Sequence, residues 1–117
     1  MFLQLAHIKL DVFSVSREFV LLCYKETRFF PSEEKFAMIH QIRRAALSVH
    51  LNVSEGCSRK SAGERKRFYE IARGSIIVIG AASDIALNPG YTSKERLAEL
   101  EFMLVRTFQL ISKMISG

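Results

Sequence analysis

The chain has 117 residues, a length that suits one domain with a single modest hydrophobic core. Hydrophobic residues make up 49% of it and the formal net charge is +5, so the chain carries more apolar surface than one small core readily hides, which favours self-association. No apolar run approaches the roughly 20 residues of a transmembrane helix, and residues 1–7 lack the basic start and cleavage site of a secretory signal. We therefore expect a cytoplasmic protein with no membrane contact, whose two cysteines are structural thiols.

The first predicted helix covers residues 9–28, and the second begins after Ser32, its N-cap, and stops near Gly56. The first helix places these apolar residues on one face: Val12, Val15, Phe19, Leu22 and Cys23. Pro31 ends it, because the residue before a proline is disfavoured in the α region. The stripe of the second helix comprises Ile39, Ile42, Ala46, Val49 and Val53, with Leu47 and Leu51 widening its apolar face.

Two capping boxes mark the starts of the third and fourth helices: Ser61 with Glu64, and Thr92 with Glu95. The third stripe comprises Phe68, Ala72, Ser75, Ile79, Ala82 and Ala86. The fourth comprises Leu97, Leu100, Leu104, Phe108, Ile111 and Ile115. Short connections between long amphipathic helices force neighbours to run antiparallel. The sequence therefore predicts an all-α fold, a single antiparallel up-down-up-down four-helix bundle over residues 1–117.

Two of these helices carry apolar residues outside their core stripes. Ile77 points away from the third stripe, and Gly80 and Ala81 leave a patch of small residues beside it. The fourth stripe is flanked by a ridge of Met103, Leu110 and Met114. Two interpretations are open: isolated surface hydrophobes, which are common, or a homo-oligomer interface, which the composition favours.

The excess positive charge is concentrated in one stretch. Residues 43–73 hold eight basic and three acidic residues, whereas the rest of the chain holds nine of each. The candidate nucleic-acid-binding residues are Arg59, Lys60, Arg65, Lys66 and Arg67 around the turn between the second and third helices, with Arg73 and Arg44 further along these helices. Such patches attract phosphate backbones by Coulomb attraction and counterion release.

Structural roles compete with this interpretation. The arginines of this stretch can pair with Glu55, Glu64 and Glu70 and form a solvated end. Tyr69 is either a base-stacking residue or a core residue. Arg43, at the rim of the second stripe, is expected to pair with an acid on another helix.

No motif points to catalysis. The three histidines lack metal-binding spacing, and neither a phosphate-binding glycine-rich loop nor a nucleophile elbow is present. Cys57 lies near Arg59 and Lys60, which would lower the pKa of its thiol, but no histidine adjacent in the sequence activates it. We expect no enzymatic activity, no cofactor and no metal ion.

Several segments carry a family resemblance: Gln41-Ile42-Arg43-Arg44-Ala45-Ala46, Asn52-Val53-Ser54-Glu55-Gly56, Arg59, Phe68, Ile71-Ala72-Arg73-Gly74-Ser75, Gly90-Tyr91 and Ser93. They resemble the bacterial four-helix-bundle family, also called 23S rRNA-intervening sequence proteins. The resemblance implies a cytoplasmic bacterial bundle that forms ring-like homo-oligomers, typically pentamers, and it supplies no catalytic residues. Distantly related accessory proteins of diversity-generating retroelements are basic pentamers that bind nucleic acid and a reverse transcriptase. The chain departs from the family pattern at Phe13, where a tryptophan is usual, and after Gly74-Ser75, where acidic residues are common.

These observations lead to one functional hypothesis and one alternative. The hypothesis is a non-enzymatic homo-oligomer that contacts the RNA or DNA backbone without base specificity. The alternative is a protein-interaction scaffold whose charge serves solubility or an acidic partner protein.

Overall fold

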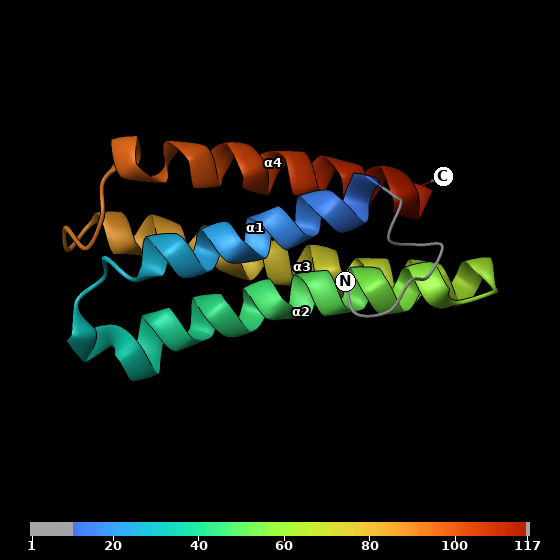
Figure 1. The fold of residues 1–117 in the computed structure, drawn as a ribbon, viewed down its shortest axis with the longest axis horizontal. Helices are drawn as coiled ribbons and strands as arrows, with labels where there is room; N and C mark the ends of the chain where they lie inside the picture. The colour runs from blue at the N-terminus through green and yellow to red at the C-terminus, as the bar shows by residue number, and fades with distance from the viewer. Residues whose placement is uncertain (1–10, 117) are drawn as a thin grey trace.

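The computed structural model describes residues 11–116, apart from the side chain of Lys35. Within this range the chain folds into four α-helices, α1 (Asp11–Thr27), α2 (His40–Ser58), α3 (Ala62–Leu87) and α4 (Lys94–Ser116). Each helix runs antiparallel to the next, and α1 and α3 each pack against both α2 and α4 (Figure 1). The predicted up-down-up-down four-helix bundle is confirmed. The predicted start of the first helix at Lys9 lies outside the described residues.

The core lies along the bundle axis, where one apolar stripe from each helix meets the other three. All five residues of the predicted α1 stripe are buried. The largest side chains that are fully buried are Phe19, Ile42, Ile76, Ile79 and Ile111. Burying an aliphatic or aromatic side chain of this size contributes about 1.5–3 kcal/mol, so these stripes supply most of the driving force for folding.

Hydrogen bonds between side chains fix the register of neighbouring helices. Ser16 of α1 lies 2.7 Å from Nδ1 of His50 on α2, and the Ser75 hydroxyl of α3 donates to the Ser48 hydroxyl of α2 at 3.0 Å. On the other side of α3, Arg73 donates to the Ser112 hydroxyl of α4 at 3.3 Å. A shift of one helix turn would break these bonds, so the bundle has one preferred axial alignment.

The connection between α1 and α2 differs from the prediction. Ser32 begins a 3₁₀ turn (Ser32–Glu34), a π-helix follows (Lys35–Ile39), and the α-helix begins only at His40. A tertiary contact accompanies this irregular start: the Tyr91 hydroxyl, in the α3–α4 loop, donates to the Glu34 carboxylate at 2.6 Å. Ser32 as the N-cap of a regular second helix was therefore a wrong prediction.

Two helix boundaries also need correction. Gly56 does not end α2, which continues to Ser58. The cap of α4 is Ser93 and not Thr92, because the Ser93 hydroxyl accepts a hydrogen bond from the backbone N–H of Arg96 at 3.2 Å. The Ser61 cap of α3 is confirmed, since its hydroxyl accepts from the Glu64 N–H at 3.1 Å.

Three expectations about the core also change. Leu47 and Leu51 are exposed and do not widen the core face of α2. Phe68 is only half-buried, while Tyr69 and Ile76 take the buried positions of α3. Ala72, Ile79 and Ala86 of the predicted stripe are buried as predicted. Phe68 and Ser75 lie one position before the residues that are buried.

Arg43 contacts the C-terminal end of α1. Its Nε donates to Oγ1 of Thr27 at 2.8 Å, and its Nη2 donates to the backbone carbonyl of Tyr24 at 3.2 Å. Its guanidinium carbon lies 5.1 Å from the centroid of the Tyr24 ring. Carbonyls at a helix C-terminus lack helical partners and carry the negative end of the dipole, so they bind a cation well. The expected ion pair between Arg43 and an acidic residue was a wrong prediction. Among the described residues, Arg43 binds the C-terminal end of α1 instead.

A candidate nucleic-acid interface at the turn between α2 and α3

The hairpin of α2 and α3 projects beyond the ends of α1 and α4 (Figure 1). We call its projecting part, residues 55–69, the hairpin tip. Hydrogen bonds and ring contacts within the tip join its two helices, and the three-residue turn 59–61 connects them. Its geometry therefore follows from local contacts.

Arg65 closes the turn. Its Nη1 donates to the backbone carbonyls of Arg59 at 3.0 Å and of Lys60 at 2.6 Å. These carbonyls follow the end of α2 and would otherwise depend on water. Arg65 therefore has a structural role in the turn, in addition to its charge.

Arg59 is also engaged within the tip. Its Nη2 lies 3.3 Å from the Glu55 carboxylate, one turn back on α2, and both side chains are close to half exposed. Its guanidinium carbon lies 5.0 Å from the centroid of the Phe68 ring. An exposed ion pair contributes at most about 1 kcal/mol, so a phosphate can compete for Arg59.

Gly56, Cys57 and Tyr69 form a small cluster next to the turn. Gly56 allows the Tyr69 ring to lie directly on the α2 backbone, since a Cβ at position 56 would be 2.7 Å from Cε1 of Tyr69. The Tyr69 hydroxyl donates to the sulfur of Cys57 at 3.4 Å. Only 4% of Tyr69 is exposed, so it is a core residue and is not available to stack on a base.

The environment of this cluster keeps Cys57 and Tyr69 neutral. Burial raises the pKa of the Cys57 thiol, and the hydrogen bond from Tyr69 offsets this only in part. Burial, followed by the contact with Cys57, raises the pKa of Tyr69 as well. A thiol held neutral at physiological pH is a poor nucleophile, which is consistent with the structural role expected for Cys57.

Three cations of the tip are exposed and free: Lys60, Lys66 and Arg67. Within residues 11–116 none of their side chains forms a hydrogen bond or an ion pair, and neither Glu64 nor Glu70 pairs with a basic residue of the tip. We call these three side chains the free cations. They give the tip a positive charge that its own acids do not neutralise.

The other two predicted binding residues lie away from the tip. Arg73 is half-buried, bonded to Ser112, and its guanidinium carbon lies 6.0 Å from the centroid of the Phe108 ring of α4. Arg44 is exposed, but it precedes the end of α2 by 14 residues, which corresponds to about 20 Å along the helix. The structure thus brings five of the seven predicted residues together.

The predicted interface residues divide between surface and core. Ile77 is 59% exposed and Ala81 is exposed on the outer side of α3, while Gly80 is half-buried beside Leu104. Met103 is only 8% exposed and belongs to the core. Leu110 and Met114 are partly buried against it.

Sequence reasoning missed three further exposed residues of α3. Ile71, Val78 and Ile85 follow one another at intervals of seven residues, a spacing that places them on one helical face and could have revealed them. Gly74 and Ala81 lie between them on the same face. We call the surface formed by Ile71, Gly74, Ile77, Val78, Ala81 and Ile85 the α3 outer face.

Two features that would indicate other functions are absent from the described residues. Among residues 11–116, no group of three or more histidine, cysteine or acidic side chains is arranged to hold a metal ion. None of the helices in this range has a stretch that is long and apolar enough to span a bilayer.

Comparison with known proteins identifies the family. A model of the 23S rRNA-intervening sequence protein family matches residues 8–117. A search of curated proteins returns no match. The family match extends over all four helices and the hairpin tip. The chain therefore belongs to the 23S rRNA-intervening sequence protein family.

Proposed function

We propose that this protein is a non-enzymatic, self-associating module that binds the backbone of RNA or DNA through the hairpin tip. The observation that carries the proposal is the set of free cations, which stand exposed on a projecting hairpin without partners among the described residues. A phosphate that meets Lys60, Lys66 or Arg67 replaces solvent and not an existing ion pair. Binding there therefore costs little rearrangement.

Charge is also distributed unevenly along the bundle, in a way that directs a polyanion to the tip. Residues 55–73 hold six basic and three acidic residues. The segments 26–35 and 84–101, at the opposite end, hold four basic and seven acidic residues. Such a field attracts a polyanion to one end and repels it from the other.

The tip contacts the backbone and does not read bases. Tyr69 is buried, and the exposed side chains of the tip are mainly lysines and arginines, which bind phosphates of any sequence. If each free cation neutralises one phosphate, log K falls with log salt with a slope of about −2 to −3.

Self-association is supported by the α3 outer face. Four of its residues are large hydrophobic side chains that are exposed, and Gly74 and Ala81 leave room for another helix to approach. Contiguous apolar surface of this kind marks interaction sites. Several copies would present several tips, and the avidity of a multivalent complex would compensate for weak single contacts.

A salt series tests the proposal. Fluorescence anisotropy would follow a labelled single-stranded RNA and a labelled DNA duplex between 50 and 300 mM salt. The test variant replaces the three free cations with glutamine and leaves Arg65 in place, because Arg65 closes the turn. The matched control replaces Arg17, Lys25 and Arg28 with glutamine as well, so that the net charge changes equally. These three residues are exposed on α1 or just after it.

We expect the tip variant to lose at least tenfold in affinity and most of its salt dependence, and the control to change less than threefold. Circular dichroism verifies that both variants fold. Equal losses in the two variants would mean that net charge acts without a site. Absence of binding by the unaltered protein would contradict the nucleic-acid role and leave a scaffold for protein partners, which the α3 outer face also supports.

Light scattering tests self-association separately. The unaltered protein should form oligomers at micromolar concentration, and the substitutions Ile77→Glu and Ile85→Glu should shift it to monomers. A monomeric unaltered protein would contradict this part of the proposal and leave the tip hypothesis intact.

A further inference from the structure

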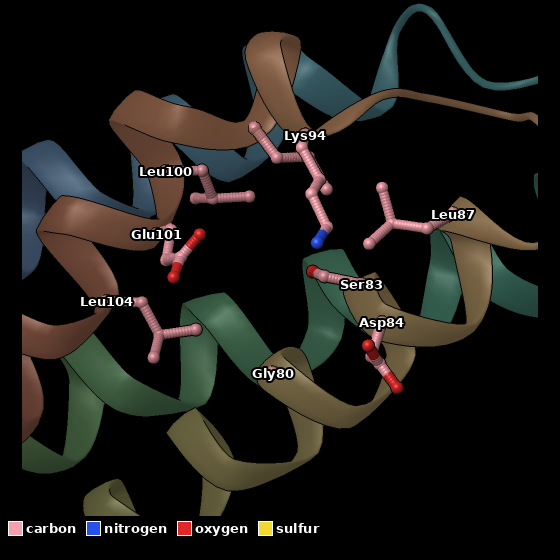
Figure 2. Close-up of a pocket in the computed structure, with 9 residues that line it drawn as sticks. Gly80, Ser83, Asp84, Leu87, Lys94, Leu100, Glu101 and Leu104 are labelled. Carbon is pink, nitrogen blue, oxygen red and sulfur yellow. The ribbon is translucent and has the colours of Figure 1, made fainter.

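A groove lies between α3 and α4 (Figure 2). Its lining residues are near the α3–α4 loop, in the half of the bundle away from the tip (Figure 1). Its volume is about 540 Å³, within the range of small-molecule sites in proteins. None of the tip residues lines it, so it is independent of the proposed nucleic-acid site.

The floor of the groove is apolar. Leu97 and Leu100 are buried beneath it, and Leu104 forms part of its wall. Gly80 deepens it, since a Cβ built there would meet only Leu104 within 4 Å, at 3.7 Å. The groove therefore reaches the backbone of α3. An alkyl chain buried on such a floor gains up to about fourfold in affinity for each methylene.

The edge of the groove is polar and carries net negative charge. Asp84 of α3 and Glu101 of α4 line it from opposite sides, and neither forms an ion pair within the described residues. Lys94 extends across the groove with its amine toward Ser83 (Figure 2). The lining thus carries one ammonium group and two carboxylates, a net charge of −1 that favours a cationic ligand.

Ser83 adds an unsatisfied group. Its hydroxyl oxygen is buried and has no hydrogen-bond partner among the described residues. It points into the groove (Figure 2). Buried polar groups are normally hydrogen-bonded, so an occupant that offers an N–H to this oxygen would complete the site.

We propose that the α3–α4 groove binds a small amphiphilic cation, an alkyl chain that ends in an ammonium or guanidinium group. The chain lies on Leu97, Leu100 and Leu104. The head group lies between the Asp84 and Glu101 sides of the groove, where both carboxylates attract it, and donates to the Ser83 hydroxyl. The acidic residues at this end of the bundle attract the cation and disfavour an anion of the same shape.

NMR titration of the full-length, ¹⁵N-labelled protein tests the proposal with n-octylammonium as the probe. We expect saturable shifts of the Gly80, Leu97 and Leu104 amides. Shortening the probe to n-hexylammonium should weaken binding about tenfold, because two methylenes leave the floor. Octanoate, which has the same length and the opposite charge, should bind at least tenfold more weakly than n-octylammonium.

Variants separate the two halves of the site. Asp84→Asn combined with Glu101→Gln should remove the preference for n-octylammonium over neutral n-octanol and leave n-octanol binding unchanged. A matched control, Glu95→Gln with Glu99→Gln, removes two charges from α4 residues that do not line the groove and should change nothing. Gly80→Leu should fill the groove and abolish binding of every probe, with circular dichroism as the check on folding.

Three results would overturn the proposal. The first is octanoate binding as tightly as n-octylammonium, and the second is an affinity that does not depend on chain length. The third is the absence of saturable n-octylammonium binding to the unaltered protein. None of them bears on the tip, because the nucleic-acid assay uses different residues.

Discussion

Replacing Gly56 with alanine should destabilise the bundle, although alanine is the better helix former. Gly56 lies inside α2, and an added Cβ would be 2.7 Å from Cε1 and 3.0 Å from Cδ1 of the Tyr69 ring, and 3.1 Å from Cβ of Phe68. Carbon atoms in contact normally lie about 3.5–4.0 Å apart, so the ring must shift by roughly half an ångström or more. The ring is almost fully buried, and its hydroxyl is bonded to Cys57.

Two opposing terms set the magnitude. Overpacking in a buried contact costs about 1–3 kcal/mol. Removing a glycine from a helix interior returns about 0.5–1 kcal/mol. We therefore expect Gly56→Ala to lower the free energy of unfolding by about 0–2.5 kcal/mol.

Gly74→Ala is the matched control. Gly74 lies in the interior of α3, and a Cβ there meets no atom of the same chain within 4 Å, so within one subunit only the helix-propensity term remains and the variant should gain about 0.5–1 kcal/mol. Urea denaturation followed by circular dichroism measures both variants, at two protein concentrations to exclude an effect of association. In a Tyr69→Leu background, which removes the ring, Gly56→Ala should become neutral or stabilising. The reasoning is refuted if Gly56→Ala is as stable as Gly74→Ala.

Three further predictions concern a cap, a helix end and pH. Ser61→Ala should lower the free energy of unfolding, measured by urea denaturation, by about 1 kcal/mol because the Glu64 N–H loses its acceptor. Ser61→Asp should recover this stability, because aspartate is also a good N-cap. An unchanged midpoint in Ser61→Ala would contradict the cap. Arg43→Ala should lower the free energy of unfolding by about 1–3 kcal/mol. Arg43→Lys should recover little of this loss, because one ammonium group cannot reproduce both hydrogen bonds. Full recovery of stability in Arg43→Lys would count against this geometry. Burial raises the pKa of the Cys23 thiol to about 12, so above pH 9 the unfolded chain releases a proton that the folded chain keeps. The free energy of unfolding should then fall as the pH rises from 9 to 10, by up to about 1.4 kcal/mol per pH unit for this thiol. Urea denaturation at several pH values should show a smaller pH dependence in Cys23→Val.

Local signals in the sequence were sufficient for the main elements of the fold. The spacing of Val12, Val15 and Phe19 specifies a helix face, and the cap at Ser61 depends only on residues within one turn. These features follow from the helical period and from backbone hydrogen bonding, which act between near neighbours. The four helices and their antiparallel order were predictable for this reason.

Predictions failed where a distant residue decides the local structure. The Tyr69 ring packs on Gly56 inside α2, and no pattern around residue 56 indicates this contact. The irregular segment before α2 includes Glu34, whose partner Tyr91 lies 57 positions away in the sequence. Arg43 has a helix end as its partner, where a carboxylate was the simpler expectation.

The candidate site shows the same division. The charge run placed positive residues at the turn, but the sequence did not distinguish the free cations from arginines that are engaged. Arg65 reaches back across the turn, Arg59 pairs within α2, and Arg73 is held by α4. These assignments depend on the pairing of helices and could not be read from residue order. The groove between α3 and α4 had no signal in the sequence, because its residues come from two helices whose register is set by tertiary contacts.

The short range of the contacts in the hairpin tip has a consequence for dynamics. Tyr69 and Cys57 are 12 residues apart, and Arg65 and the Arg59 carbonyl are 6 apart. Closing such short loops costs little chain entropy, so we expect the tip to form before α1 and α4 dock and to open at a lower free energy than the whole bundle. Hydrogen exchange at residues 55–69 would then report the free energy of this local opening. A polyanion held by the tip would slow exchange there and leave the amides between α1 and α4 unaffected.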